Sequence, residues 1–264
     1  MMMVGQLRSG RLKVEPVACL QDNYAYIVWT EGGSDAVIID ASAAAPVRSA
    51  LRNLRLRPCA ILSTHHHSDH TGGNLSLAEE FSLPIYASQV DRDRVPGCSV
   101  ALEDGGQFAA AGIGFSVLHL RGHTQGALVY LTDNICFTGD TLFCGGCGRL
   151  KEGTADELFG SLERLKQLLG PETICYTGHE YTEANLRFAR RIEPDNVELR
   201  RRLERVALAR RRGEFAAAAR FDLELGTNPF LRTGEPAVAQ GAGLKRGAPQ
   251  VSVFSRLREL KDIA

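Results

Sequence analysis

The stretch STHHHSDHTGG, from Ser63 to Gly73, places four histidines and one aspartate within residues 65–70. It overlaps the end of CAILST, residues 59–64, an apolar run typical of a buried strand. His65 therefore opens the loop at the carboxyl end of a strand, where open α/β folds commonly carry their chemistry. Burying so many polar side chains without partners would be costly, so the stretch predicts a metal-binding loop in an α/β fold.

Strand geometry separates the histidines from one another. Alternate side chains of an extended segment point the same way, so we expect His65 and His67 to face together and His66 to face away from them. After a turn, Asp69 and His70 can reach a second point a few ångströms away. The local pattern thus predicts two pairs of donors, with His66 outside both.

Three further strands end in glycine followed by a candidate ligand. LRGH, FTGD and YTGH place His123, Asp140 and His179 directly after a glycine. Glycine permits a sharp turn or a close approach of the backbone. A single Gly-Asp pair is usually only a turn, but three such ends beside a histidine cluster indicate one site.

Seven donors suit two metal ions better than one, because zinc and similar ions take about four or five N/O ligands and catalytic sites keep a position for water. Two cations on one water lower its pKa from 15.7 toward about 7, which provides a nucleophile at neutral pH. Metal-assisted hydrolysis follows, with Asp69 and Asp140 as the catalytic carboxylates. The predicted metal ligands are His65, His67 and His123 for the first ion, Asp69, His70 and His179 for the second, and Asp140 shared between them.

The charge pattern divides the 264-residue chain. Its net charge is zero, yet residues 1–180 carry 14 Lys+Arg against 20 Asp+Glu, and residues 181–264 carry 17 against 11. Alternating strands and amphipathic helices fill the first part, and the second part is rich in arginine and helical in pattern. We therefore expect a catalytic domain over residues 1–180 and a helical domain over residues 181–264.

Two helices carry their own start signals. Thr154 and Glu157 have the spacing of a capping box ahead of a helix that Gly170 should end. Asp195 and Glu198 repeat that spacing ahead of an arginine-rich helix. Its arginines are interpreted as a solvated face, with a nucleic-acid patch as the sharper alternative.

Composition favours a cytoplasmic globular protein. Apolar residues make up 44% of the chain and charged residues 23%, and no apolar run approaches the ~18 residues of a membrane span. The start, MMMVGQLRSG, lacks the apolar core of a secretory signal. The odd number of cysteines, seven, argues against a disulfide framework. Cys144 and Cys147 form an isolated C-x-x-C, which is weak evidence for metal or redox chemistry.

The ligand order H-x-H-x-D-H, Gly-His, Gly-Asp, Gly-His resembles that of the metallo-β-lactamase superfamily. Within it, the chain resembles the hydroxyacylglutathione hydrolase (glyoxalase II) family over nearly its whole length. The motifs that carry the resemblance are DNYAYIV, THHHSDHTGG, GHTQGALVY, FTGDTLF, GCGRLKEGTADEL, TGHEYTEANLRFA and TNPFLR.

The resemblance implies both the architecture and the reaction. The expected fold is an α/β αββα metallo-β-lactamase sandwich with a small helical C-terminal domain that binds substrate. The expected cofactors are two divalent transition-metal ions per chain, zinc first, with iron or manganese as alternatives. The expected reaction is hydrolysis of S-(R)-lactoylglutathione to D-lactate and glutathione, a step of methylglyoxal detoxification. A thioester suits such a site, because a thiol of pKa near 8.5 leaves as thiolate without strong acid assistance.

The resemblance also implies a set of substrate contacts. They are Arg149, Lys151, Tyr181, Arg258 and Lys261. The R-x-x-K pair, Arg258 and Lys261, would grip a carboxylate of glutathione. Lys151 stands where the family usually has an aromatic residue, and Ala41 follows Asp40 where proline is common. The expected partner is therefore a glutathione thioester bound by a monomer, without nucleic acid or membrane.

Other functions remain open from the sequence. Class B β-lactamases share H-x-H-x-D but use cysteine at the position of Asp140. Persulfide dioxygenases use a single iron and lack the helical domain, and oxygen uptake would reveal them. RNase Z-like nucleases share the ligands and would bind RNA with a steep salt dependence. A purely structural role for the metals is disfavoured, because structural zinc sites are usually cysteine-rich and closed.

Overall fold

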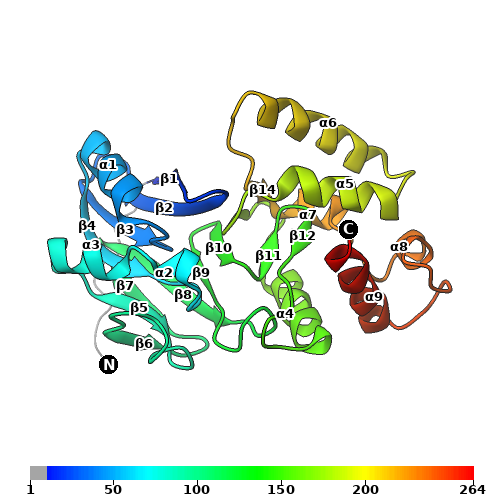
Figure 1. The fold of residues 1–264 in the computed structure, drawn as a ribbon, viewed down its shortest axis with the longest axis horizontal. Coiled ribbons are helices and arrows are strands. Elements are labelled where there is room, and N and C mark those ends of the chain that lie inside the picture. Colours follow the sequence, from blue (N-terminus) through cyan, green and yellow to red (C-terminus); the bar gives the residue numbers. More distant parts are fainter. Residues whose placement is uncertain (1–10) are drawn as a thin grey trace. The chain divides into compact units, whose positions relative to one another are not determined.

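The computed structural model describes residues 11–264, which divide into two compact units (Figure 1). Unit 1 comprises residues 11–119 and Leu128–Asp133, and unit 2 comprises Leu120–Ala127 and Asn134–Ala264. No helix within residues 11–264 combines the length and the apolar character that crossing a membrane requires.

Unit 1 is built of strands with helices packed on them. Its strands are β1 (Leu12–Cys19), β2 (Asn23–Thr30), β3 (Asp35–Ile39), β4 (Arg57–Leu62), β5 (Ile85–Ser88), β6 (Val100–Leu102), β7 (Gln107–Ala110), β8 (Ile113–His119) and β9 (Leu128–Thr132). Its helices are α1 (Ala44–Leu54), α2 (Ser68–Thr71) and α3 (Asn74–Phe81). One sheet has the order β1-β2-β3-β4-β5-β6, and β7, β8 and β9 pair antiparallel.

Burial of the central strands holds this sheet in register. Ile38 of β3 and Ile61 of β4 are register partners in a parallel pair, and both are fully buried. Val47 and Leu51 of α1 cover the same cluster, as the apolar spacing of that helix requires. Each such side chain contributes about 1.5–3 kcal/mol by leaving water.

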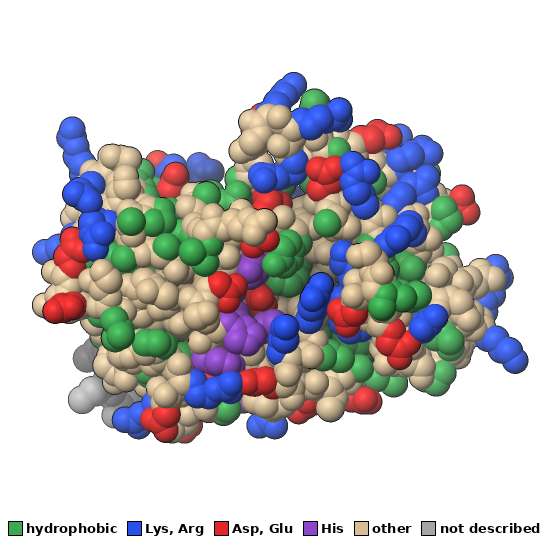
Figure 2. Space-filling view, viewed as in Figure 1, with side chains coloured by type: hydrophobic (Ala, Val, Ile, Leu, Met, Phe, Trp, Pro, Cys, Tyr) green, Lys and Arg blue, Asp and Glu red, His purple; other side chains and the backbone are tan. Residues whose placement is uncertain are grey.

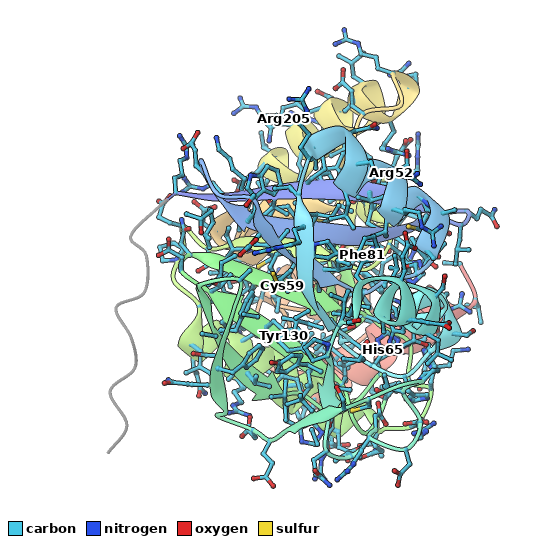
Figure 3. The ribbon with its side chains drawn as sticks, turned by 90° about the vertical axis from the view of Figure 1, so that its left-hand side faces the viewer. Arg52, Cys59, His65, Phe81, Tyr130 and Arg205 are labelled. Carbon is cyan, nitrogen blue, oxygen red and sulfur yellow. The ribbon has the colours of Figure 1, made fainter. Side chains whose placement is uncertain are left out.

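The parallel pairing of β3 and β4 also positions the candidate site. The carboxyl ends of parallel neighbours meet at one edge of a sheet, so the residues that follow the two strands lie close together. Asp40 follows β3 and His65 lies just beyond the end of β4, whose Cys59 is labelled with it in Figure 3.

Unit 2 holds the remaining elements. Its strands are β10 (Ile135–Gly139), β11 (Leu142–Phe143), β12 (Gly146–Cys147), β13 (Ile174–Thr177) and β14 (Ala218–Arg220). Its helices are α4 (Ala155–Leu168), α5 (Thr182–Ile192), α6 (Val197–Arg211), α7 (Phe221–Thr227), α8 (Pro236–Gly241) and α9 (Gln250–Asp262). β10 and β13 are parallel, β14 lies antiparallel to β13, and β11 and β12 form a small hairpin.

The helix starts confirm one sequence expectation and correct another. Thr154 and Glu157 form the predicted capping box of α4, although the helix ends at Leu168, before Gly170. The box predicted from Asp195 is wrong by one residue, because the Asn196 side chain caps α6 by accepting from the backbone N–H of Leu199. Asn196 also donates to the Gly226 carbonyl, a tertiary contact that the local pattern could not reveal.

All seven cysteines are free thiols in the structure. Cys144 and Cys147 are both buried. Burial raises the pKa of Cys147 to about 11 and the pKa of Cys144 well above its ordinary value, so both pack as protonated apolar side chains.

Candidate metal centre

The loop after β4 brings two histidine nitrogens together in unit 1. The Nε2 atom of His65 lies 3.0 Å from the Nδ1 atom of His67. His66 has different partners: its Nδ1 atom lies 2.9 Å from a carboxylate oxygen of Asp91, and Arg94 donates to its Nε2 atom at 2.6 Å. The structure therefore agrees with the alternation that sets His66 apart from its two neighbours.

Asp40 orients the next histidine of the same loop. Its carboxylate accepts hydrogen bonds from the backbone N–H and the hydroxyl of Thr64, both at 2.7 Å, and lies 2.9 Å from Nδ1 of His70. This contact occupies Nδ1 of His70 and leaves Nε2 facing Asp69, the arrangement typical of a carboxylate–histidine–metal triad. Asp40 is buried and has a positive φ of 50°, a strained conformation of the kind that accumulates at functional sites.

Asp69 forms the second donor pair of unit 1. One of its carboxylate oxygens lies 3.7 Å from Nε2 of His70. Asn23, the first residue of β2, donates to that same oxygen at 3.0 Å and to the Asp69 backbone carbonyl at 3.1 Å. Asp69 and His70 both lie in the short helix α2, which the sequence analysis did not predict.

Unit 2 gathers the other three predicted ligands around one carboxylate oxygen. The Oδ2 atom of Asp140 lies 3.5 Å from Nε2 of His123 and 3.5 Å from Nε2 of His179. All three residues are buried. Imidazole nitrogens and carboxylate oxygens are both donors that zinc takes in proteins, so the three side chains form a compact donor set.

A backbone contact fixes the tautomer of His123. Its Nδ1 atom lies 2.9 Å from the carbonyl oxygen of Arg149, so Nδ1 carries the proton and Nε2 keeps its lone pair for a metal.

The glycine before this histidine is required by packing as well as by turn geometry. Gly122 has a φ of 139°, and a Cβ there would lie 2.4 Å from the Cβ of Leu158 on α4.

Side chains from the C-terminal helices hold the β11–β12 hairpin, which follows Asp140. Asn228 donates to the carbonyl oxygens of Phe143 and Gly146, and Asn185 donates to that of Cys144. Glu224 accepts from the backbone N–H of Gly145 and pairs with buried Arg202. The hairpin therefore depends on buried polar groups that lie about 40 to 85 residues away in sequence.

The substrate contacts implied by the sequence differ in their surroundings. Arg149 and Lys151 are exposed, whereas the side chain of Arg258 is buried and only 3% exposed. Arg258 donates to the carbonyl oxygens of Cys147 at 3.0 Å and Gly148 at 3.3 Å, and to Asp262 at 3.0 Å. Its guanidinium therefore supports the last residue of the hairpin and the residue that follows it.

Tyr181 and Lys261 present more accessible groups. The ring of Tyr181 stacks on that of His179, with centroids 4.7 Å apart and planes at 6°. The Nζ atom of Lys261 lies 5.4 Å from the ring centroid of Phe188. Burial, followed by the charges of neighbouring arginines, lowers the pKa of Lys261 to about 8.

Two family models together match nearly the whole chain. The metallo-beta-lactamase superfamily model matches residues 20–179, and the model described as hydroxyacylglutathione hydrolase C-terminus matches residues 180–264. A protein from Methylococcus capsulatus named hydroxyacylglutathione hydrolase is 42% identical over 254 residues, which cover 96% of this chain and 98% of that protein. The chain belongs to the hydroxyacylglutathione hydrolase family.

Solved structures place this family member in the metallo-β-lactamase fold. ETHE1 from Myxococcus xanthus aligns with a TM-score of 0.67 at 22% identity, covering 94% of this chain and 90% of that one. TTHA1623, crystallised in a di-iron-bound form, aligns with a TM-score of 0.54 at 33% identity, covering 65% of this chain and 96% of that one. The expected fold class, a metallo-β-lactamase fold with a helical C-terminal part, is confirmed.

The family and the donor set together indicate bound divalent metal ions. Imidazole nitrogens and carboxylate oxygens are ligands that suit zinc, iron and manganese, and histidines reach the surface on the face shown in Figure 2. The persulfide dioxygenase and RNase Z-like alternatives are not favoured, because the family match extends through the C-terminal residues 180–264.

Asp40 and Asn23 are the site residues that the sequence prediction missed. Each positions a predicted ligand without belonging to the His/Asp motifs. A usable signal was present in both cases: Asp40 directly follows β3, the parallel neighbour of β4, and Asn23 is the second residue of the DNYAYIV motif.

Proposed function

We propose that the chain is a metal-dependent thioester hydrolase that converts S-(R)-lactoylglutathione to D-lactate and glutathione. One observation carries the proposal: a single oxygen of Asp140 lies 3.5 Å from both His123 and His179, in a chain of the hydroxyacylglutathione hydrolase family. Water adds across the thioester, so that the acyl carbon gains a hydroxyl and the glutathione sulfur leaves and takes the proton.

We further propose that two zinc ions occupy the seven ligands, with iron or manganese as possible replacements. His65, His67 and His123 would hold the first ion, Asp69, His70 and His179 the second, and Asp140 both. The donor pairs within each unit, at 3.0 to 3.7 Å, support this division. When bound, the ions lower the pKa of a water toward about 7 and polarise the thioester carbonyl.

The protein's own residues orient the ligands and hold their protons. The carboxylate of Asp40 keeps the proton of His70 on Nδ1, and the Arg149 carbonyl keeps that of His123 on Nδ1. Asn23 holds the Asp69 carboxylate in place. Because these partners are fixed before substrate arrives, little reorganisation is needed during the reaction.

Glutathione itself would be held by the cationic side chains of unit 2. Lys261 and Arg149 carry charges suited to a glutathione carboxylate, and Tyr181 stacks beside His179. Arg258 supports the backbone between the hairpin and Arg149, so its contribution to binding includes positioning that segment. We include Lys151 as a peripheral contact.

We propose a functional division into a catalytic part, residues 1–180, and a substrate-binding part, residues 181–264. The two family models, which meet between residues 179 and 180, support it. We also propose that the enzyme acts as a cytoplasmic monomer on a small molecule, without nucleic acid or membrane. Its free cysteines suit a reducing compartment.

A comparative assay tests the function. Metal-replete protein is given lactoylglutathione, a coenzyme A thioester and a β-lactam, and its metal content is measured in parallel. We expect rapid hydrolysis of the glutathione thioester only and about two ions per chain. The Asp140→Ala variant should lose activity and bind less metal at both positions. Equal rates on the two thioesters, or one ion in the active protein, would contradict the proposal.

A further inference from the structure

Three cationic side chains in unit 2 lie near the rings of two stacked phenylalanines. Phe188 of α5 and Phe230 are buried, with ring centroids 6.2 Å apart and planes at 20°. The guanidinium carbon of Arg258 lies 5.2 Å from the centroid of Phe230. Lys261 and Arg191 both approach Phe188, with Nζ at 5.4 Å and Cζ at 5.6 Å from its centroid. Ring faces attract cations, which partly offsets the repulsion among the three charges.

The three cations differ in how their charges are neutralised. Arg258 is paired with Asp262 and donates to two backbone carbonyls. Within residues 11–264, neither Lys261 nor Arg191 has a carboxylate oxygen within 4.0 Å. By contrast Arg187, one turn earlier on α5, pairs with Glu183. Two cations that approach the same ring, close enough for the charge of Arg191 to lower the pKa of Lys261, and that form no ion pair of their own within the described residues make a site complementary to a carboxylate.

We propose that Arg191 is a further substrate-binding residue, which together with Lys261 holds a carboxylate of the glutathione moiety. The inference rests on the proposed function and adds a residue outside the R-x-x-K pair. Arg191 follows Phe188 by three positions on α5, a spacing that puts its side chain over the ring. It is exposed, so a ligand can reach it.

Helix α5 connects this position to the rest of the candidate site. The helix begins directly after Tyr181, whose ring stacks on His179, and Arg191 lies in its last turn. An 11-residue helix is ~16 Å long, which a tripeptide and an extended arginine side chain can span together. Lys and Arg side chains, with some Asp and Glu among them, gather on the surface over α5 and α6 (Figure 2).

Calorimetric titration with S-methylglutathione, a thioether that cannot be hydrolysed, tests the inference on metal-replete protein. We expect Arg191→Ala to raise the dissociation constant about three- to tenfold, the range for an exposed charge-assisted contact. Arg191→Lys should recover much of the loss because it restores the positive charge. Arg190→Ala is the matched control, since it removes the same charge from the adjacent position, and it should change affinity less than about twofold.

The outcomes separate this inference from the proposed function. If the parent hydrolyses lactoylglutathione but Arg191→Ala and Arg190→Ala bind S-methylglutathione equally well, the role of Arg191 is wrong and the function stands. If affinity depends on Arg191 while no thioester is hydrolysed, the function fails and the binding role stands. A parent that hydrolyses lactoylglutathione yet binds no S-methylglutathione would also overturn the role of Arg191.

Discussion

Raising the pH through 8 should weaken the binding of a glutathione thioester, because Lys261 loses its charge over that range. Burial and the neighbouring arginines lower the pKa of Lys261 to about 8. Its ammonium is therefore about nine-tenths protonated at pH 7 and about one-tenth protonated at pH 9. A bound carboxylate favours the charged form and raises this pKa in the complex. Affinity is thus full below pH 8 and declines as the pH rises above it.

The expected size follows from the exposure of the contact. A hydrogen bond to a charged group contributes about 1.5–3 kcal/mol, and solvent screening at a half-buried site reduces this to roughly 1 kcal/mol. Complete loss of the charge would raise KM about fivefold, and because the bound complex keeps part of the charge at pH 9, we expect a rise of about threefold between pH 7 and pH 9. The chemical step should change much less, because the contact lies away from the scissile bond and acts alike in ground state and transition state.

Steady-state kinetics across this range, at constant ionic strength and metal content, measures the effect. The pH profile of kcat/KM reports the groups of the free enzyme, so an inflection near pH 8 is expected for the parent. Lys261→Arg keeps its charge over the whole range and should flatten the profile. Lys261→Met should have a high KM throughout. The amino group of the substrate titrates identically for all three proteins, so differences among them report Lys261.

Two results would refute this reasoning. A parent whose KM is the same at pH 7 and pH 9 would show that Lys261 does not contact an anionic group of the substrate. An identical rise in KM for Lys261→Arg would assign the effect to the substrate or to another residue.

Other substitutions probe the ligand supports. Asp40→Asn should lower metal affinity or activity about 10- to 100-fold, measured by elemental analysis and kcat, because an amide cannot hold the tautomer of its histidine; full metal and full kcat would contradict this. His66→Ala should retain metal and His67→Ala should lose it, and equal metal contents would contradict the alternation. Arg258→Ala should lower kcat as well as raise KM, because Arg258 supports the segment whose carbonyl orients His123; an unchanged kcat would restrict it to binding.

The candidate ligands could be named from the sequence because their signals are local. Alternation along one extended segment separates His66 from His65 and His67, and this depends only on neighbouring residues. The glycine that precedes His123 likewise marks a strand end, and the structure requires it there through a positive φ and close packing on Leu158. Apolar runs located the strands for the same reason, since a buried strand must be apolar wherever it lies in the fold.

The supports of these ligands depended on the tertiary structure. Asp40 lies 30 residues from His70, and Asn23 lies 46 residues from Asp69. Nothing in the local sequence connects either pair, because the parallel pairing of β3 with β4 brings Asp40 to the ligand loop only after folding. The one-residue error at the start of α6 has the same origin, since Asn196 is also held by Gly226.

By itself, the sequence determined the family, the fold class and the chemistry of the donors, because each follows from residue types at short spacing. Only the tertiary structure decided which groups surround the cations of unit 2. Arg258 is 111 residues from the Cys147 carbonyl to which it donates. Arg191 of α5 and Lys261 of α9 both approach the ring of Phe188. Such roles depend on which charges and carbonyls burial leaves within reach, and that is set by the packing of distant segments.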